Sequence, residues 1–356
     1  MKSIQDIIRQ DIQAMKAYPV ACVPENVARL DSMESPYDFP PAMQAELGSL
    51  LAKAPIRLYP HIDHDDLIPM IRKTFCVPEN ASIATGNGSD ELIQLLCMLV
   101  AKPNAKVLSI EPTFVMYQTD ARLYGMEYIS VPLNDDLTLN LANTLQAIEQ
   151  HQPDLIFLAY PNNPTGTPYD RKDVEQIIQA ATGLVVIDEA YGAFSSDSFL
   201  PQAGTPEKLL VLRTFSKIGF AGLRLGFISG SLNIIQELKK IIPPYNMNQL
   251  SLVAAKYAMT HYDWVEQNIN QLKMEREIMF AALEGMTNVT VFPSEANFIT
   301  VRVPDAEKCF DALLSQGFLI KKLHGSHSLL NNCLRITIGS PEQNKKVIDI
   351  LEKNIS

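Results

Sequence analysis

The segment Arg213-Thr-Phe-Ser-Lys-Ile-Gly-Phe-Ala-Gly-Leu-Arg-Leu-Gly226 follows an apolar run, Leu209–Leu212, that is typical of a buried strand. Two hydroxyls, one amine and one guanidinium therefore gather in a short turn beyond that strand, from Thr214, Ser216, Lys217 and Arg224. Hydroxyls and a guanidinium suit a phosphate group. A lysine held beside them loses affinity for its proton, and such an amine can form a Schiff base.

A basic surface turn is the alternative interpretation of this segment, and two other segments argue against it. The segment Leu184–Tyr191 begins with a second apolar run that is typical of a buried strand. Asp188 stands at the end of that run, and Tyr191 follows three residues later. Ala159–Gly166 follows a third run and carries Asn163. A carboxylate, a phenol, an amide, a lysine and a phosphate-binding turn are the groups that pyridoxal phosphate needs.

Taken in this order, the three segments resemble the fold-type I pyridoxal phosphate-dependent aminotransferases, and among them the histidinol-phosphate aminotransferases. The resemblance rests on Asn-Pro-Thr-Gly at 163–166, Asp-Glu-Ala-Tyr at 188–191, Ser-Lys at 216–217 and Gly-Leu-Arg-Leu-Gly at 222–226. It extends from Tyr18 to Arg335 and beyond. It implies an α/β fold, with a mostly parallel central sheet flanked by helices and a smaller α+β domain.

The resemblance also assigns the cofactor site. Lys217 carries pyridoxal phosphate and transfers the proton, Asp188 keeps the ring nitrogen protonated, and Tyr191 acts with them as the third catalytic residue. Asn163 and Tyr191 bind the ring oxygen, and Phe114 stacks on the ring. Glycines before a helix start at Ser89 and Asp90 make a further anion site. The cofactor phosphate is expected to contact Ser89, Asp90, Thr214, Ser216, Arg224 and, from the neighbouring subunit of a homodimer, Tyr59.

The substrate site is the part with departures from the family. The resemblance places Tyr18, Asn163 and Arg335 at the substrate. It expects a second arginine where this chain offers Lys321 or Lys322, which are point charges without the bidentate fork. The family usually has Asn where Met33 stands.

The function implied by the resemblance is transamination of L-histidinol phosphate with 2-oxoglutarate in histidine biosynthesis. Small-molecule partners follow from it: a phosphorylated amine and 2-oxoglutarate or glutamate. An aromatic or broad-specificity aminotransferase and a threonine-phosphate decarboxylase share the cofactor site and stay open. A non-catalytic regulator on the same fold is expected to have lost the lysine, whereas Lys217 is present.

The amino-acid composition restricts the classes of partner and the cellular compartment that are expected. The 356 residues carry a formal net charge of −10, which argues against nucleic acid or an anionic membrane as the main partner. Five cysteines are scattered without a C-x-x-C pair, which favours reduced thiols in a cytoplasmic protein. No apolar run is long enough for a membrane span. His61 and His64 stand beside acids, yet no further ligand motif accompanies them, so no metal is predicted.

Periodicity predicts the order of elements. Strands near 106–111, 127–131, 155–160, 184–188, 209–214 and 225–229 alternate with helical stretches, a pattern typical of a layered α/β domain. Helices are expected over 3–16 and, as one long element, over 249–283. The predicted divisions are an N-terminal arm and small-domain segment at 1–38, a large cofactor-binding domain at 39–245, and a small C-terminal domain with its linking helix at 246–356. Pro243-Pro244 marks the second boundary.

Overall fold

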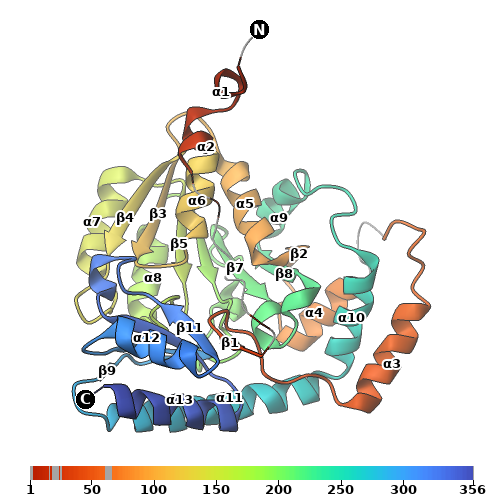
Figure 1. Cartoon of the computed structure of the whole chain (residues 1–356). Helices are drawn as coiled ribbons and strands as arrows, with labels where there is room; N and C mark the ends of the chain where they lie inside the picture. Colours follow the sequence, from red (N-terminus) through yellow and green to blue (C-terminus); the bar gives the residue numbers. More distant parts are fainter. Residues whose placement is uncertain (1–2, 16, 18–23, 25, 61–65, 356) are drawn as a thin grey trace.

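A computed structural model describes residues 3–15, 17, 24, 26–60 and 66–355. Its backbone forms two sheets, and helices cover both of them (Figure 1). The larger sheet lies at the centre of the molecule, and the smaller one is built mainly from the C-terminal part of the chain. Among the described residues, no helix has both the length and the apolar content needed to span a bilayer.

The large sheet is mixed but mostly parallel. Its strands, in spatial order, are β2 (Ser82–Asn87), β8 (Leu225–Gly230), β7 (Leu209–Thr214), β6 (Leu184–Asp188), β5 (Leu155–Ala159), β3 (Lys106–Glu111) and β4 (Glu127–Pro132). The run from β7 to β4 is parallel, whereas β8 pairs antiparallel with both β7 and β2. The predicted strands between residues 106 and 230 are therefore confirmed, and so is the predicted α/β class.

Alternate residues of the central strands enter two separate cores. Leu155 and Phe157 of β5 pack under the helices α5 (Gly88–Val100), α6 (Met116–Leu123) and α9 (Leu232–Lys239). Ile156 and Leu158 face the opposite core, which includes the helices α7 (Leu141–His151) and α8 (Arg171–Ala180). A strand sends successive side chains to opposite faces, so continuous apolar runs are what a sheet covered on both sides requires.

The small sheet brings together segments that are far apart in the sequence. Its order is β1 (Ala28–Leu30), β11 (Phe318–Lys322), β12 (Cys333–Thr337), β10 (Phe298–Arg302) and β9 (Thr290–Val291). The N-terminal strand β1 pairs in parallel with β11, and the other pairings are antiparallel. The helices beside this sheet are α12 (Ala306–Ser315), α13 (Pro341–Asn354) and α11 (Tyr262–Glu284). The domain limits given above stay predictions.

Two predicted helices are interrupted. The stretch 249–283 divides at His261 into α10 (Gln249–Thr260) and α11, because the His261 backbone has φ −110° and ψ 35°. The stretch 3–16 divides into α1 (Ile4–Ile7) and α2 (Gln10–Ala14), since Ile8 is extended. The other helices are α3 (Pro41–Ala52), α4 (Leu67–Phe75) and the 3-10 turns η1 (Leu200–Gln202), η2 (Ser216–Ile218), η3 (Ala221–Leu223) and η4 (Ser328–Leu330).

Candidate active site

The site lies at one edge of the large sheet, where the chain direction brings several strand ends together. Asp188 ends β6 and Thr214 ends β7, while Asn163 and Phe114 follow β5 and β3 within four residues. Because β8 runs antiparallel, its first residue, Leu225, lies at this same edge, opposite the last residue of β2. In α/β sheets this carboxyl edge is where ligands bind.

A single cavity of about 920 Å³ occupies this edge. Its volume is of the size that small-molecule sites usually have. Most of the residues predicted for cofactor and substrate line it, namely Ser89, Asp90, Phe114, Asn163, Asp188, Tyr191, Thr214, Ser216, Lys217, Arg224, Lys321 and Arg335. Residues separated by up to 246 positions in the chain therefore share one chamber.

Lys217 is the middle residue of the turn η2, three residues beyond the end of β7. Its Nζ donates a hydrogen bond to the backbone oxygen of Ser32, 3.1 Å away, and lies 5.8 Å from the ring centroid of Tyr191. Burial lowers the pKa of Lys217 to about 8, and the positive charge of Arg335 acts in the same direction. A neutral amine is therefore accessible near physiological pH, as a nucleophile or proton acceptor requires.

Asp188 is buried and accepts two hydrogen bonds. The backbone N–H of Ala190 donates to its Oδ1 at 3.0 Å, and the hydroxyl of Tyr117 donates to its Oδ2 at 2.7 Å. Burial raises the pKa of Asp188 to about 6, while both hydrogen bonds lower it. Sequence reasoning missed Tyr117, because a tyrosine on the inner face of a helix looks like ordinary core.

The predicted phosphate-binding groups converge beside Lys217. The Thr214 hydroxyl donates to Ser216 Oγ at 2.9 Å, and Arg224 Nη2 lies 3.1 Å from Asp90 Oδ2. These groups meet the start of α5, whose first backbone N–H groups have no partner within the helix. Gly88 has φ +78°, and a Cβ there would lie 2.7 Å from Arg224 Nη2, so a larger residue would fill the space beside the guanidinium.

Arg335 joins the two sheets. From β12 of the small sheet, its Nη1 donates to Asn163 Oδ1 at 2.5 Å and its Nη2 donates to the backbone oxygen of Asp31 at 2.7 Å. The guanidinium also lies over the Phe298 ring, 5.2 Å from its centroid. A buried arginine at a cavity wall is well placed for a carboxylate or phosphate.

The two candidate lysines on β11 differ in placement. Lys321 lines the cavity. Lys322 lies outside its lining and forms an ion pair with Glu307 at 2.5 Å, because adjacent side chains on a strand point to opposite faces. Of the two alternatives, this geometry favours Lys321 for the substrate, and that role stays a prediction.

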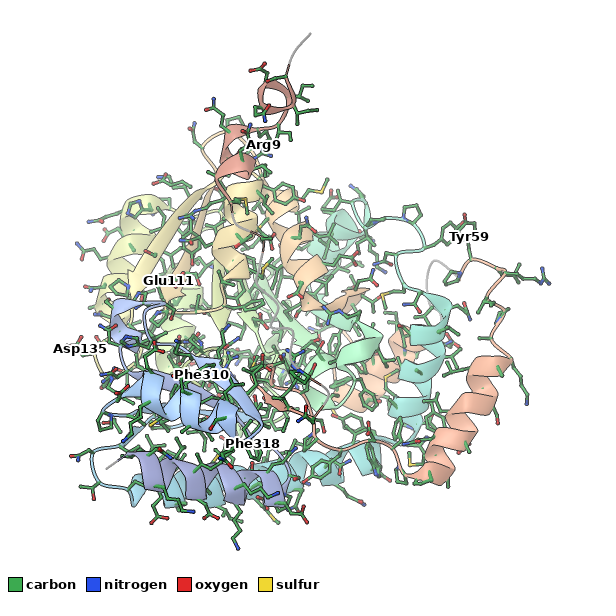
Figure 2. The ribbon with its side chains drawn as sticks, in the orientation of Figure 1. Arg9, Tyr59, Glu111, Asp135, Phe310 and Phe318 are labelled. Carbon is green, nitrogen blue, oxygen red and sulfur yellow. The ribbon has the colours of Figure 1, made fainter. Side chains whose placement is uncertain are left out.

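Tyr59 does not line the cavity of its own chain. Its ring is 79% exposed and stacks on Tyr245 with centroids 4.5 Å apart, at the outer edge of the molecule (Figure 2). Tyr18 lies outside the described residues. Met33, where the family usually has Asn, lines the cavity with φ +56°, a left-handed conformation in which Asn is several-fold enriched.

A partly buried lysine after β7, a buried carboxylate at the end of β6, and hydroxyl and guanidinium groups beside the start of α5 are the arrangement typical of a fold-type I pyridoxal phosphate-dependent enzyme. The family model for "Aminotransferase class I and II" matches residues 25–351. The chain therefore belongs to the class I and II aminotransferases.

Similar proteins agree with this placement. The histidinol-phosphate aminotransferase of Neisseria meningitidis serogroup C is 55% identical, and the match covers 99% of this chain and 98% of that protein. The histidinol-phosphate aminotransferase of Chromobacterium violaceum is 47% identical, and the match covers 99% of this chain and 98% of that protein. The crystal structure of histidinol-phosphate aminotransferase from Sinorhizobium meliloti in complex with pyridoxal-5'-phosphate superposes with a TM-score of 0.86, 23% identity and coverage of 98% and 97%.

Proposed function

We propose that this chain is a pyridoxal phosphate-dependent aminotransferase that acts on L-histidinol phosphate and 2-oxoglutarate in histidine biosynthesis. The main support is the full-length 55% identity with a histidinol-phosphate aminotransferase, together with a cavity lined by both Lys321 and Arg335. The donor carries a phosphate and the acceptor two carboxylates, so one pocket must accept different anions. Cationic side chains on the small-sheet side of the cavity meet that requirement.

The residues present fit the cofactor. Pyridoxal phosphate supplies a carbonyl that condenses with amines and a protonated ring that withdraws electrons. Asp188 would pair as a carboxylate with the protonated ring nitrogen, and Asn163 and Tyr191 would hydrogen-bond to the ring oxygen. Phe114 offers an apolar face for the ring, and the cup at Ser89, Asp90, Thr214, Ser216 and Arg224 holds the phosphate.

Lys217 moves the proton in this proposal. When it is not bound to the cofactor, its Nζ would be the base in this cavity that can hold and move a proton of the substrate. Its pKa of about 8 leaves a useful neutral fraction near pH 7, so it can accept the proton and return it. Arg335 and Lys321 orient the substrate by its anionic group, and Asn163 keeps the Arg335 guanidinium in position.

Decarboxylation of threonine phosphate is the rival that also needs a phosphate site. A crystal structure of L-threonine-O-3-phosphate decarboxylase from Porphyromonas gingivalis superposes with a TM-score of 0.76 and 24% identity, covering 92% of this chain and 99% of that one. That likeness concerns the fold alone. An aromatic aminotransferase needs no phosphate site, so the cationic cavity wall does not favour it.

Two measurements test the proposal. Borohydride reduction of the purified yellow protein should fix the cofactor on Lys217, as peptide mass spectrometry will show. Steady-state kinetics should give a higher kcat/KM for histidinol phosphate than for phenylalanine, and no release of carbon dioxide from threonine phosphate. Labelling of another lysine would contradict the cofactor site, and a preference for phenylalanine would contradict the substrate.

A homodimer with shared active sites and a cytoplasmic location also belong to this proposal. Tyr59 and its neighbours Ile56 and Leu58 are largely exposed, and together they form an apolar surface that a second copy can cover. Tyr59 would then contact the cofactor phosphate of the partner. The four cysteines within the described residues are free thiols, as a reducing compartment favours.

A further inference from the structure

Tyr117 approaches the site from behind Asp188. It lies on α6, its side chain is completely buried, and its hydroxyl is 2.7 Å from Asp188 Oδ2. Its ring stacks on Phe157 of β5 with centroids 4.6 Å apart and an interplanar angle of 2°. Phe114, the residue expected to stack on the cofactor, meets the same ring edge-on at 5.7 Å. Packing on two sides therefore fixes the direction of the hydroxyl.

The hydrogen bond from Tyr117 lowers the pKa of Asp188. A phenol donates to a carboxylate and stabilises its charged form, so it opposes the effect of burial. Among the charged groups that act on Asp188, Asp90 at the start of α5 and the neighbouring Glu189 disfavour its charge. The hydrogen bonds from Tyr117 and the Ala190 amide thus favour the anionic form of Asp188 against the effect of burial.

We propose that Tyr117 is a positioning residue of the reaction, whose hydroxyl keeps Asp188 ionised and aimed so that the proton between Asp188 and the cofactor ring stays on the ring nitrogen. This inference rests on the proposed function. Without the hydroxyl, the carboxylate becomes more basic and takes a larger share of that proton. The ring then withdraws electrons less strongly, and loss of the proton from the substrate carbon becomes slower.

The test is Tyr117→Phe, which keeps the ring and its stack on Phe157 and removes the hydroxyl. With cofactor labelled at the ring nitrogen with ¹⁵N, the NMR signal of the loaded enzyme should move toward the unprotonated position. The pH midpoint of the visible absorption of the bound cofactor should rise by about 0.5 to 1 pH unit, the equivalent of one hydrogen bond. In kinetics, kcat should fall about 3- to 10-fold with little change in KM.

Tyr169→Phe is the matched control. Tyr169 is also a buried tyrosine, and its hydroxyl has no hydrogen-bond partner within the described residues. Its loss should leave the nitrogen signal and the absorption midpoint unchanged. Replacement of Tyr117 by 3-fluorotyrosine, a stronger donor of the same shape, should move the absorption midpoint in the opposite direction to Tyr117→Phe, which covers the case in which the phenylalanine variant folds poorly.

Failure of the role of Tyr117 and failure of the aminotransferase function would give different results. A nitrogen signal and midpoint equal to wild type in Tyr117→Phe, or no opposite shift with 3-fluorotyrosine, would overturn the role of Tyr117 while the enzyme remains an aminotransferase. Wild-type protein that takes up no cofactor would overturn the proposed function itself.

Discussion

At the scale of single residues, the site depends on charges that burial makes costly. Lys217 and Arg335 both line one cavity, where water solvates their charges less well than on an open surface. Arg335 is stabilised by oxygens of Asn163 and Asp31. Within the described residues, the Ser32 oxygen accepts a hydrogen bond from Lys217; because an amine is a weaker base than a guanidinium, Lys217 is the one of the two that can lose its proton.

We therefore predict that Arg335→Gln raises the pKa of Lys217. Removing a nearby positive charge favours the protonated amine, so the folded-state pKa should increase from about 8 toward the ordinary lysine value. The measurement is the rate at which an amine-reactive reagent labels Lys217 in cofactor-free enzyme as a function of pH. The midpoint should move upward, and labelling at pH 8 should become slower.

Arg29→Gln is the control for this prediction. Arg29 also lines the cavity, but it forms an ion pair with Asp31 at 3.2 Å, so its charge is largely compensated. Its removal should change the labelling midpoint little. An unchanged midpoint in Arg335→Gln would mean that Arg335 does not contribute to the lowered pKa of Lys217.

Residue types at strand ends could be predicted, whereas partners across the core could not. Asp188 and Thr214 stand at the end of apolar runs, a signal present in the sequence itself. Tyr117 lies 71 positions before Asp188, and the packing of α6 on the sheet brings the two together. Its position on the buried face of α6 is one that any apolar core residue could take, so the sequence does not indicate that its hydroxyl contacts Asp188.

At the scale of elements, strands were easier to predict than helix interruptions. Buried strands need apolar residues at every position, so their limits show clearly between polar turns. The interruption at His261 has no such signal, because the residues on both sides continue a helical period and neither Gly nor Pro is present there. The break depends on local backbone angles that tertiary packing selects.

The start of α5 gives a prediction about the cofactor phosphate. Gly88→Ala places a Cβ at a positive φ and against Arg224, so the guanidinium must move. We expect the Kd for pyridoxal phosphate to rise by about 10-fold or more, the loss of one charge-assisted contact. Fluorescence titration of cofactor-free enzyme measures this change.

Gly125→Ala is the matched control for Gly88→Ala. Gly125 also has a positive φ, of 68°, but a Cβ there meets nothing within 4 Å. It should lower the unfolding free energy by about 1 kcal/mol without changing the Kd. Equal cofactor affinity in both variants would argue against a phosphate at the start of α5.

Strand β11 supplies a paired test of substrate binding. Lys321→Ala should raise KM for histidinol phosphate by about 10-fold, the effect of one lost ionic contact, and affect phenylalanine little. Lys322→Ala removes an ion pair with Glu307 in which both side chains are partly exposed, so unfolding should change by less than about 1 kcal/mol and KM should stay the same. Steady-state kinetics on both variants decides; similar KM values would exclude Lys321 from the phosphate site.

At the scale of the whole molecule, the small sheet is tied to the large one through the site itself. Arg335 of β12 holds Asn163 beyond β5, and the segment near Ser32 crosses between them to reach Lys217. Parallel pairing of β1 with β11 anchors that segment on the small sheet. A substrate anion that binds Arg335 therefore acts on a contact shared by both sheets and the N-terminal segment.

The assembly is tested by complementation between two inactive variants. Tyr59 lies at the outer edge of the molecule, away from the cavity of its own chain (Figure 2). If its hydroxyl reaches the partner's cofactor phosphate, each site contains residues of both subunits related by a two-fold axis. Tyr59→Ala and Lys217→Ala, unfolded and refolded together in equal amounts, should then form mixed dimers in which one site carries both lesions and the other neither.

About a quarter of all sites should be intact after random mixing, and activity should recover to about that fraction of wild type. Each variant refolded alone is the control, and Tyr59→Ala must be clearly impaired in it, since one charge-assisted hydrogen bond is worth about 1.5–3 kcal/mol. Mixed dimers, separated by different affinity tags, should carry the recovered activity. If such dimers stay inactive, Tyr59 serves the site of its own subunit or no site, and the shared active site must be abandoned even if the protein is a dimer.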